Sequence, residues 1–86
     1  MTALQERTER HMKALGELIE WSIDNSWSFA DDIMPNLPQM ARCKRLTYLL
    51  NRGFAEMKKY PHEPSSLWRV TPTGREAYRE YKELAA

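Results

Sequence analysis

Apolar residues recur at helical spacing in the first quarter of the chain. Between about Leu4 and Ile23, one side of a helical wheel carries mostly apolar or small side chains, and the other side carries mostly charged ones. The first side holds Leu4, Thr8, His11, Leu15, Leu18, Ile19 and Ser22. This pattern predicts an amphipathic helix within residues 1–25. The helix is expected to end at Asp24-Asn25-Ser26, because these residue types prefer turns.

A short second helix is predicted after this turn, over about residues 29–34. Ser28 is a favoured N-cap residue, and Asp31, three positions later, approximates a capping box. Pro35 is expected to close the helix, because the residue before a proline is pushed out of the α region.

A third and longer helix is predicted from Pro38 to Arg52. Pro38 suits the first helical position, and Gly53 suits the position just after the helix end. Its inward side is expected to carry Cys43, Leu46, Thr47 and Leu50, and its outward side Ala41, Lys44, Arg45, Tyr48 and Arg52. A packed thiol is therefore expected for Cys43, rather than a redox sensor.

Residues 54–70 predict a β-hairpin. In its first strand, Phe54 and Met57 are expected near the core. In its second strand, Trp68 and Val70 share one face, and a loop rich in turn-forming residues joins the two strands.

A last helix is predicted over residues 73–86. Either Thr71-Pro72 or Thr73 is expected to cap it, and Thr73 and Glu76 have the spacing of a capping box. Its apolar stripe offers aromatic side chains, which protein interfaces favour. The expected contacts of a homodimer are therefore Tyr78, Tyr81 and Leu84. The alternative is that this helix packs only against the first helix of its own chain.

The order of these elements and two motifs resemble winged-helix DNA-binding domains. The string LTYLLNRGFA, from Leu46 to Ala55, is similar to the end of the recognition helix in that superfamily. The string WRVTPTGREA, from Trp68 to Ala77, resembles the exit from the wing in MarR-like and PadR-like bacterial regulators. Leucines hold such a helix against its neighbours, and a glycine lets the chain turn back at its end.

The resemblance implies a single α+β, mainly α, winged-helix domain over residues 1–86. Its parts would be an N-terminal helix (1–25), a helix-turn-helix unit (28–53), a wing hairpin (54–70) and a C-terminal helix (73–86). The three helices before the hairpin would form the helix-turn-helix core, and the hairpin would be a two-stranded wing.

Charge is distributed unevenly along the chain. Residues 1–36 hold seven acids and three bases, whereas residues 37–60 hold six bases and one acid. The net charge of +1 therefore hides a local basic segment, and local fields steer a polyanion more than net charge does. Since this segment includes the third helix and part of the hairpin, DNA contact is expected there.

The expected DNA-binding residues are Gln39, Arg42, Lys44, Arg45, Tyr48, Lys58, Lys59 and Arg69. Side chains on the outward face of the third helix could read base edges in the major groove. The alternative is an ordinary solvated helix face. The hairpin cations could contact phosphates, or could protect an exposed strand edge from aggregation.

Other chemistry is not expected from this composition. Two scattered histidines and one cysteine do not match a structural zinc site, and a packed histidine is expected at His11 rather than a ligand. The carboxylates follow the solvent faces of helices, beside no activated nucleophile. We therefore expect no enzyme activity and no cofactor. No apolar run approaches the roughly 20 residues of a membrane span, and a lone cysteine fits the cytoplasm.

Together these observations predict a small sequence-specific transcriptional regulator of bacterial or phage origin. It would occupy an operator in double-stranded DNA, as a homodimer. The alternative function is a winged-helix interaction module that binds a protein partner and not DNA, such as a phage-encoded inhibitor or adaptor. In that case the acidic first helix would be the working surface.

Overall fold

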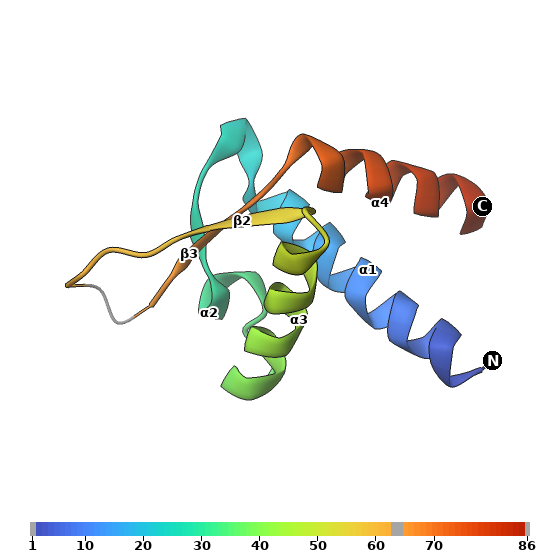
Figure 1. The fold of residues 1–86 in the computed structure, drawn as a ribbon, viewed down its shortest axis with the longest axis horizontal. Helices are drawn as coiled ribbons and strands as arrows, with labels where there is room; N and C mark the ends of the chain where they lie inside the picture. The colour runs from blue at the N-terminus through green and yellow to red at the C-terminus, as the bar shows by residue number, and fades with distance from the viewer. Residues whose placement is uncertain (1, 63–64, 86) are drawn as a thin grey trace.

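A computed structural model describes residues 2–62 and 65–85, apart from the side chain of Leu4 (Figure 1). Its helices are α1 (Ala3–Trp21), α2 (Ala30–Ile33), α3 (Gln39–Asn51) and α4 (Pro72–Ala85), with a 3-10 turn η1 (Ile23–Asn25) after α1. Its strands are β1 (Ser28–Phe29), β2 (Ala55–Lys58) and β3 (Leu67–Val70). The predicted order of helices and hairpin is confirmed, and β1 is an additional strand that the sequence pattern did not indicate.

A capping box begins α1, and two residues in the left-handed conformation follow its end. Thr2 and Gln5 form a capping box, in which the Thr2 hydroxyl accepts from the Gln5 amide at 3.2 Å and the Gln5 side chain accepts from the Thr2 amide at 2.8 Å. At the other end, Asp24 and Asn25 adopt positive φ angles of 56° and 62°. This left-handed conformation stops the helix near the predicted turn.

Ser28 does not cap α2, so that prediction was wrong. It lies in β1, opposite Trp68 of β3, and its hydroxyl donates to the carbonyl oxygen of Trp21 at 3.1 Å. Pairing with β3 extends the chain through Phe29, and α2 begins only at Ala30.

The three strands form an antiparallel sheet in the order β1-β3-β2. Its inner face carries Ser28, Ala55, Trp68 and Val70, all buried. The predicted shared face of Trp68 and Val70 is confirmed. Met57 pairs with Trp68 but is 43% exposed. The expected core position of Met57 was therefore wrong.

The core lies between α1, α3 and the inner face of the sheet. Leu15 and Leu18 of α1 and Leu46 and Leu49 of α3 are fully buried. The inward face of α3 therefore runs through Leu46 and Leu49. Cys43 and Thr47, expected inside, are exposed, and Leu50 is half-buried. The packed thiol predicted for Cys43 was wrong.

Contacts between the end of α3 and the start of α4 close the fold. Gly53 adopts a φ of +77°, as expected for a residue just after a helix. The Thr71 hydroxyl donates to the Gly53 carbonyl at 2.6 Å and accepts from the Gly74 amide at 3.0 Å. Thr71, one of the two predicted caps, therefore caps α4. The alternative capping box of Thr73 and Glu76 does not form, because the helix already begins at Pro72.

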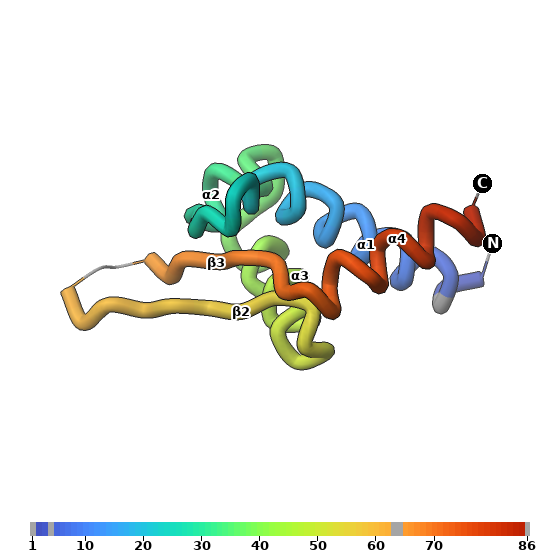
Figure 2. The backbone as a smooth tube through the Cα atoms, turned by 90° about the horizontal axis from the view of Figure 1, so that it is seen from above, coloured from blue at the N-terminus to red at the C-terminus, as the bar shows by residue number. Residues whose placement is uncertain are grey.

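The elements separate into two ends. Both termini lie at one end, where α4 packs against α1 (Figure 1). The hairpin β2–β3 leaves the body at the other end as an arm, which Figure 2 shows from above. Between these ends α3 stands with one long side open to solvent, and this side organises the candidate site.

Candidate nucleic-acid interface

The exposed side of α3 forms a continuous stripe of mostly polar side chains, called the polar stripe below. Its members are Gln39, Met40, Cys43, Lys44, Thr47 and Asn51. Positions 40, 44, 47 and 51 recur every three or four residues, so their side chains follow one line along the helix. The stripe carries amide, ammonium and hydroxyl groups, which can pair with base edges. Gln39 and Lys44 therefore lie where the sequence placed them, whereas Thr47 and Asn51 were missed because the helix is rotated from the expected orientation.

Arg42 is engaged inside the chain. Its side chain is only 15% exposed and pairs with Asp31 at 3.2 Å. Its guanidinium also donates to the carbonyl oxygens of Leu37, at 2.7 Å, and Met34, at 3.3 Å. These contacts hold the turn between α2 and α3. We therefore leave Arg42 out of the candidate interface, although the sequence placed it there.

Tyr48 takes part in the packing of α1 against α3. Its ring stacks on that of His11, with centroids 3.7 Å apart and an angle of 14° between the planes. The guanidinium carbon of Arg52 lies 5.1 Å from the centroid of the same ring. Tyr48 is half-buried, because its ring packs against α1.

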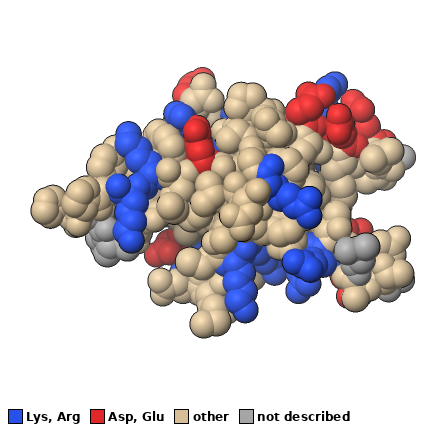
Figure 3. All heavy atoms as spheres, viewed as in Figure 1, with Lys and Arg blue, Asp and Glu red and all other residues tan. Residues whose placement is uncertain are grey.

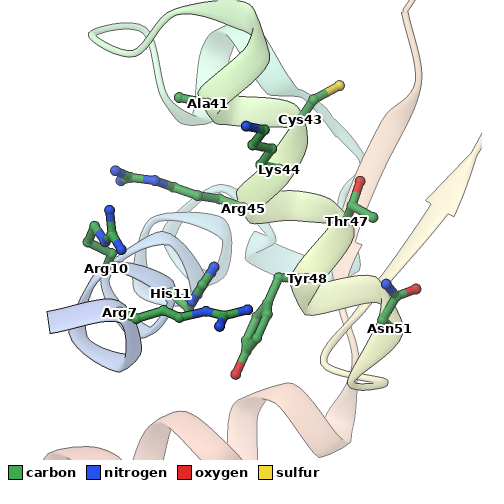
Figure 4. Close-up of a pocket in the computed structure, with 10 residues that line it drawn as sticks. All are labelled: Arg7, Arg10, His11, Ala41, Cys43, Lys44, Arg45, Thr47, Tyr48 and Asn51. Atoms are coloured by element: carbon green, nitrogen blue, oxygen red, sulfur yellow. The ribbon is translucent and has the colours of Figure 1, made fainter. Parts of the chain in front are cut away.

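A groove of about 610 Å³ separates α1 from α3. It is lined by Arg7, Arg10, His11, Ala41, Cys43, Lys44, Arg45, Thr47, Tyr48 and Asn51. Figure 4 shows the first three side chains coming from α1 and the others from α3, with His11 and Tyr48 facing each other. Four of these residues are cationic, and no carboxylate is among the described residues that line the groove.

The cations of the groove lie close enough to His11 to affect its pKa. Burial is the main cause that lowers the pKa of His11 below its ordinary value of 6.5, and the charges of Arg7, Arg10 and Arg45 lower it further. Both effects oppose a charge on the imidazole. His11 is therefore a packed histidine next to cations.

The bases of the acidic N-terminal segment all lie beside α3. Arg7 and Arg10 line the groove, and Lys13 lines a smaller hollow of about 140 Å³ together with Glu17 and Arg45. These residues were not among the expected DNA-binding residues, because charge summed by segment places them in an acidic stretch. A signal was present, since bases at positions 7, 10 and 13 recur at helical spacing next to His11.

The hairpin presents two kinds of cation. Arg69 bonds to Glu56 at 2.6 Å and its guanidinium lies 4.2 Å from the ring centroid of Trp27, so its charge is compensated within the chain. The ammonium of Lys58 lies 5.5 Å from the Trp27 ring, and the side chain is exposed. Lys59 is also exposed. Lys58 and Lys59 are thus the hairpin cations that can meet a phosphate.

The proposed dimer residues of α4 differ in their surroundings. Tyr78 is half-buried and its ring packs over Gly16 of α1. Tyr81 is half-buried, with its ring centroid 6.3 Å from that of Tyr78. Leu84 is 88% exposed. Part of the apolar side of α4 therefore packs within the chain, and the C-terminal part of that side is exposed to solvent.

Charge is segregated on the surface. Figure 3 shows Lys and Arg gathered on the hairpin and in the lower half of the molecule, with Asp and Glu gathered over the α4 end.

Among the described residues, no group of three or more His, Cys, Asp or Glu side chains could hold a metal ion. No helix in the described ranges is long and apolar enough to cross a membrane.

Comparison with protein-family models finds no match, and comparison with curated protein sequences finds none. Solved structures do match. AF1382 from Archaeoglobus fulgidus has a TM-score of 0.73 at 14% identity, over 90% of this chain and 85% of its own. A mutant of MarR from E. coli has a TM-score of 0.71 at 16% identity, over 98% of this chain. The present chain spans only 57% of that MarR chain.

PcaV from Streptomyces coelicolor, a transcriptional regulator solved with its natural ligand, has a TM-score of 0.59 at 13% identity, over 88% of this chain and 64% of its own. At such identities the likeness concerns the fold. The predicted mainly α architecture, with its helix-turn-helix core and hairpin wing, is confirmed: the chain has a MarR-like winged-helix fold.

Proposed function

We propose that the protein is a DNA-binding transcriptional regulator that places α3 in the major groove. The observation that carries this proposal is the polar stripe of α3, which has exposed cations on both sides. Arg7 and Arg10 flank it on α1, and Lys58 and Lys59 follow it on the hairpin. The fold shared with PcaV, a transcriptional regulator, supports the same function.

The side chains have distinct roles in this proposal. Gln39 and Asn51 can pair with adenine, and Lys44 with guanine, through base edges that the major groove exposes. Lys58 and Lys59 bind phosphates, which position a protein without reading sequence. The protein acts by occupying an operator in the cytoplasm, as a homodimer joined through the open end of α4, and no catalytic step is involved.

Cys43 offers a direct test, because it is the single cysteine of the chain and lies on the exposed stripe. The rate at which a maleimide labels Cys43 is measured with and without duplex DNA at low salt. We expect the duplex to slow labelling strongly and high salt to restore it. The matched control is the Cys43→Ser, Glu80→Cys variant, which carries its thiol on the exposed side of α4 and is expected to react equally with and without DNA.

Affinity for random duplex gives a second measurement. If about five phosphates are contacted, log K against log salt should slope by about −4 to −5. Binding with no protection of Cys43 would remove α3 from the interface. No binding of any duplex at low salt would reject the DNA-binding function. The alternative function, a winged-helix module that binds a protein partner and not DNA, would then be favoured.

A further inference from the structure

We propose that the groove between α1 and α3 holds the sugar-phosphate backbone of a DNA strand bordering the major groove, with Arg7 and Arg10 as phosphate contacts. This inference rests on the proposed function and extends it to a helix that sequence reasoning left out. It gives the first helix a direct part in binding a polyanion, in place of the acidic partner surface considered above.

The groove and the exposed stripe of α3 are one continuous surface. Cys43, Lys44, Thr47 and Asn51 belong to the stripe and also line the groove. A ligand that covers the stripe therefore reaches the edge of the groove without crossing a barrier of other side chains.

The dimensions of B-DNA place a sugar-phosphate strand next to the groove between α1 and α3 when α3 lies in the major groove. The major groove is about 12 Å wide, a helix with its side chains is about 10–12 Å across, and packed helices lie about 8–10 Å apart. A helix that fills the major groove thus has a sugar-phosphate strand on each flank. On one flank of α3 the next element is α1, and on the other side of the molecule the hairpin carries Lys58 and Lys59.

The charges in the groove suit a phosphodiester chain. Arg7, Arg10, Lys44 and Arg45 come from two helices and spread along its length. In the described ranges the ion pairs are formed by other arginines, namely Arg42, Arg69 and Arg79. Arg7 and Arg10 are exposed, so their guanidiniums can turn toward a ligand at little cost.

The rings of His11 and Tyr48 form the floor of the groove between the cations. This floor limits water on one side of a bound phosphate, and charge–charge attraction is stronger where water is reduced. The groove is open along α3 and its cations are spread over two helices, an arrangement that suits an extended polyanion with regularly spaced charges.

The test compares two variants that each lose two positive charges. In the groove variant, Arg7→Gln is combined with Arg10→Gln; in the control variant, Arg79→Gln is combined with Lys82→Gln on the exposed side of α4. Glutamine keeps a high helix propensity at all four positions, and equal melting temperatures would verify the folds. For each protein the salt dependence of duplex affinity is measured.

The groove variant is expected to lower the magnitude of the salt slope by about 1.8, since each lost phosphate contact contributes about 0.9. It should weaken binding to a selected site and to random duplex by the same factor, because phosphate contacts carry no sequence information. The control variant should keep the wild-type slope. A groove variant with an unchanged slope, or two variants with equal losses, would overturn the inference.

A separate measurement uses the two histidines of the chain as probes. The ring protons of His11 are followed by NMR through a pH titration with and without duplex, and His62 in the hairpin loop provides the internal comparison. A phosphate in the groove should raise the pKa of His11 in the wild type and have no such effect in the groove variant. An unchanged pKa of His11 in saturated wild-type protein would also overturn the inference.

These outcomes separate the two proposals. One outcome is that the wild type binds duplex with a steep dependence on salt, with Cys43 protected from labelling, while the groove variant behaves as the wild type does. In that case only the groove assignment falls. If the wild type binds no duplex, both proposals fall. Binding of polyglutamate in place of duplex, lost in the groove variant, would make the groove a site for an acidic protein instead.

Discussion

The imidazole ring of His11 on α1 lies almost parallel to the phenol ring of Tyr48 on α3, with their centroids 3.7 Å apart. The stack joins the helix that carries the N-terminal cations to the helix that carries the polar stripe. Because His11 is partly buried and faces Arg7, Arg10 and Arg45, its pKa is lowered from 6.5. This relationship ties the stability of the α1–α3 contact to pH.

The free energy of unfolding should fall as pH falls below about 6.5. The unfolded state, with its ordinary histidine pKa, binds a proton at a higher pH than the native state does, so acid favours unfolding. The stabilisation is fully present above 6.5 and is lost as pH passes through the lowered pKa of His11. Urea unfolding between pH 5 and 7.5 measures this dependence.

His11→Gln should flatten that pH dependence, and His62→Gln, in the exposed hairpin loop, is the control. Equal pH dependence in the wild type and in His11→Gln would show that other groups are responsible.

Gly74→Ala should destabilise the fold severely. A Cβ at this position would lie 2.1 Å from the backbone carbonyl oxygen of Phe54, and backbone atoms cannot move aside as a side chain can. We expect a loss of about 3 kcal/mol or more, at the upper end of overpacking effects. Thermal unfolding measures the loss.

Gly16→Ala is the comparison, because its added Cβ would meet the ring of Tyr78, 2.7 Å from the hydroxyl oxygen. This ring can shift, and alanine favours the helix by about 0.5–1 kcal/mol. A cost for Gly16→Ala as large as that for Gly74→Ala would contradict this account.

Leu49→Ala should cost more stability than Leu50→Ala. Leu49 is fully buried in the core, and Leu50 is half-buried at its edge. Loss of a buried leucine side chain costs about 2–5 kcal/mol, and a half-buried one should cost less. Chemical unfolding of the two variants in parallel tests the orientation of α3. A larger loss for Leu50→Ala would restore the inward face that the sequence suggested.

Arg42→Ala should destabilise the turn between α2 and α3. Its hydrogen bonds to the carbonyl oxygens of Met34 and Leu37 would be lost, and bonds from a charged group contribute about 1.5–3 kcal/mol. Arg42→Lys keeps the charge without the forked geometry and should recover only part of this stability. A fully stable Arg42→Ala that loses only DNA affinity would return Arg42 to the interface.

Leu84→Glu should weaken self-association, because Leu84 is 88% exposed at the open end of α4. A charge there would lose its water on burial in an interface. Sedimentation velocity should show a shift from dimer to monomer with an unchanged melting temperature of the monomer. Ile23→Glu, a change at another exposed apolar residue, 67% exposed, is the control and should leave the dimer intact.

Local signals in the sequence were sufficient for the order of the elements and for several of their ends. Gly53 follows α3 in a left-handed conformation because it lacks a Cβ, and Trp68 and Val70 share a face because strand residues alternate. Such features depend on neighbours a few residues away. For that reason the winged-helix order could be recognised from the sequence.

The orientation of α3 was decided by tertiary packing. Apolar and aromatic side chains occupy several sides of this helix, at Leu46, Tyr48, Leu49 and Leu50. Its own periodicity therefore does not select one inward face. Burial against α1 and the sheet selected Leu46 and Leu49, which turned Cys43 and Thr47 outward and left Tyr48 against His11.

Tertiary packing also decided which charges act together. When charge is summed by segment, Arg7, Arg10 and Lys13 fall in the acidic segment, residues 1–36. In the folded protein these three bases lie in the two hollows beside α3. A charge acts on what is near it in space, and only the crossing of α1 over α3 brings residues so far apart in the sequence to one surface.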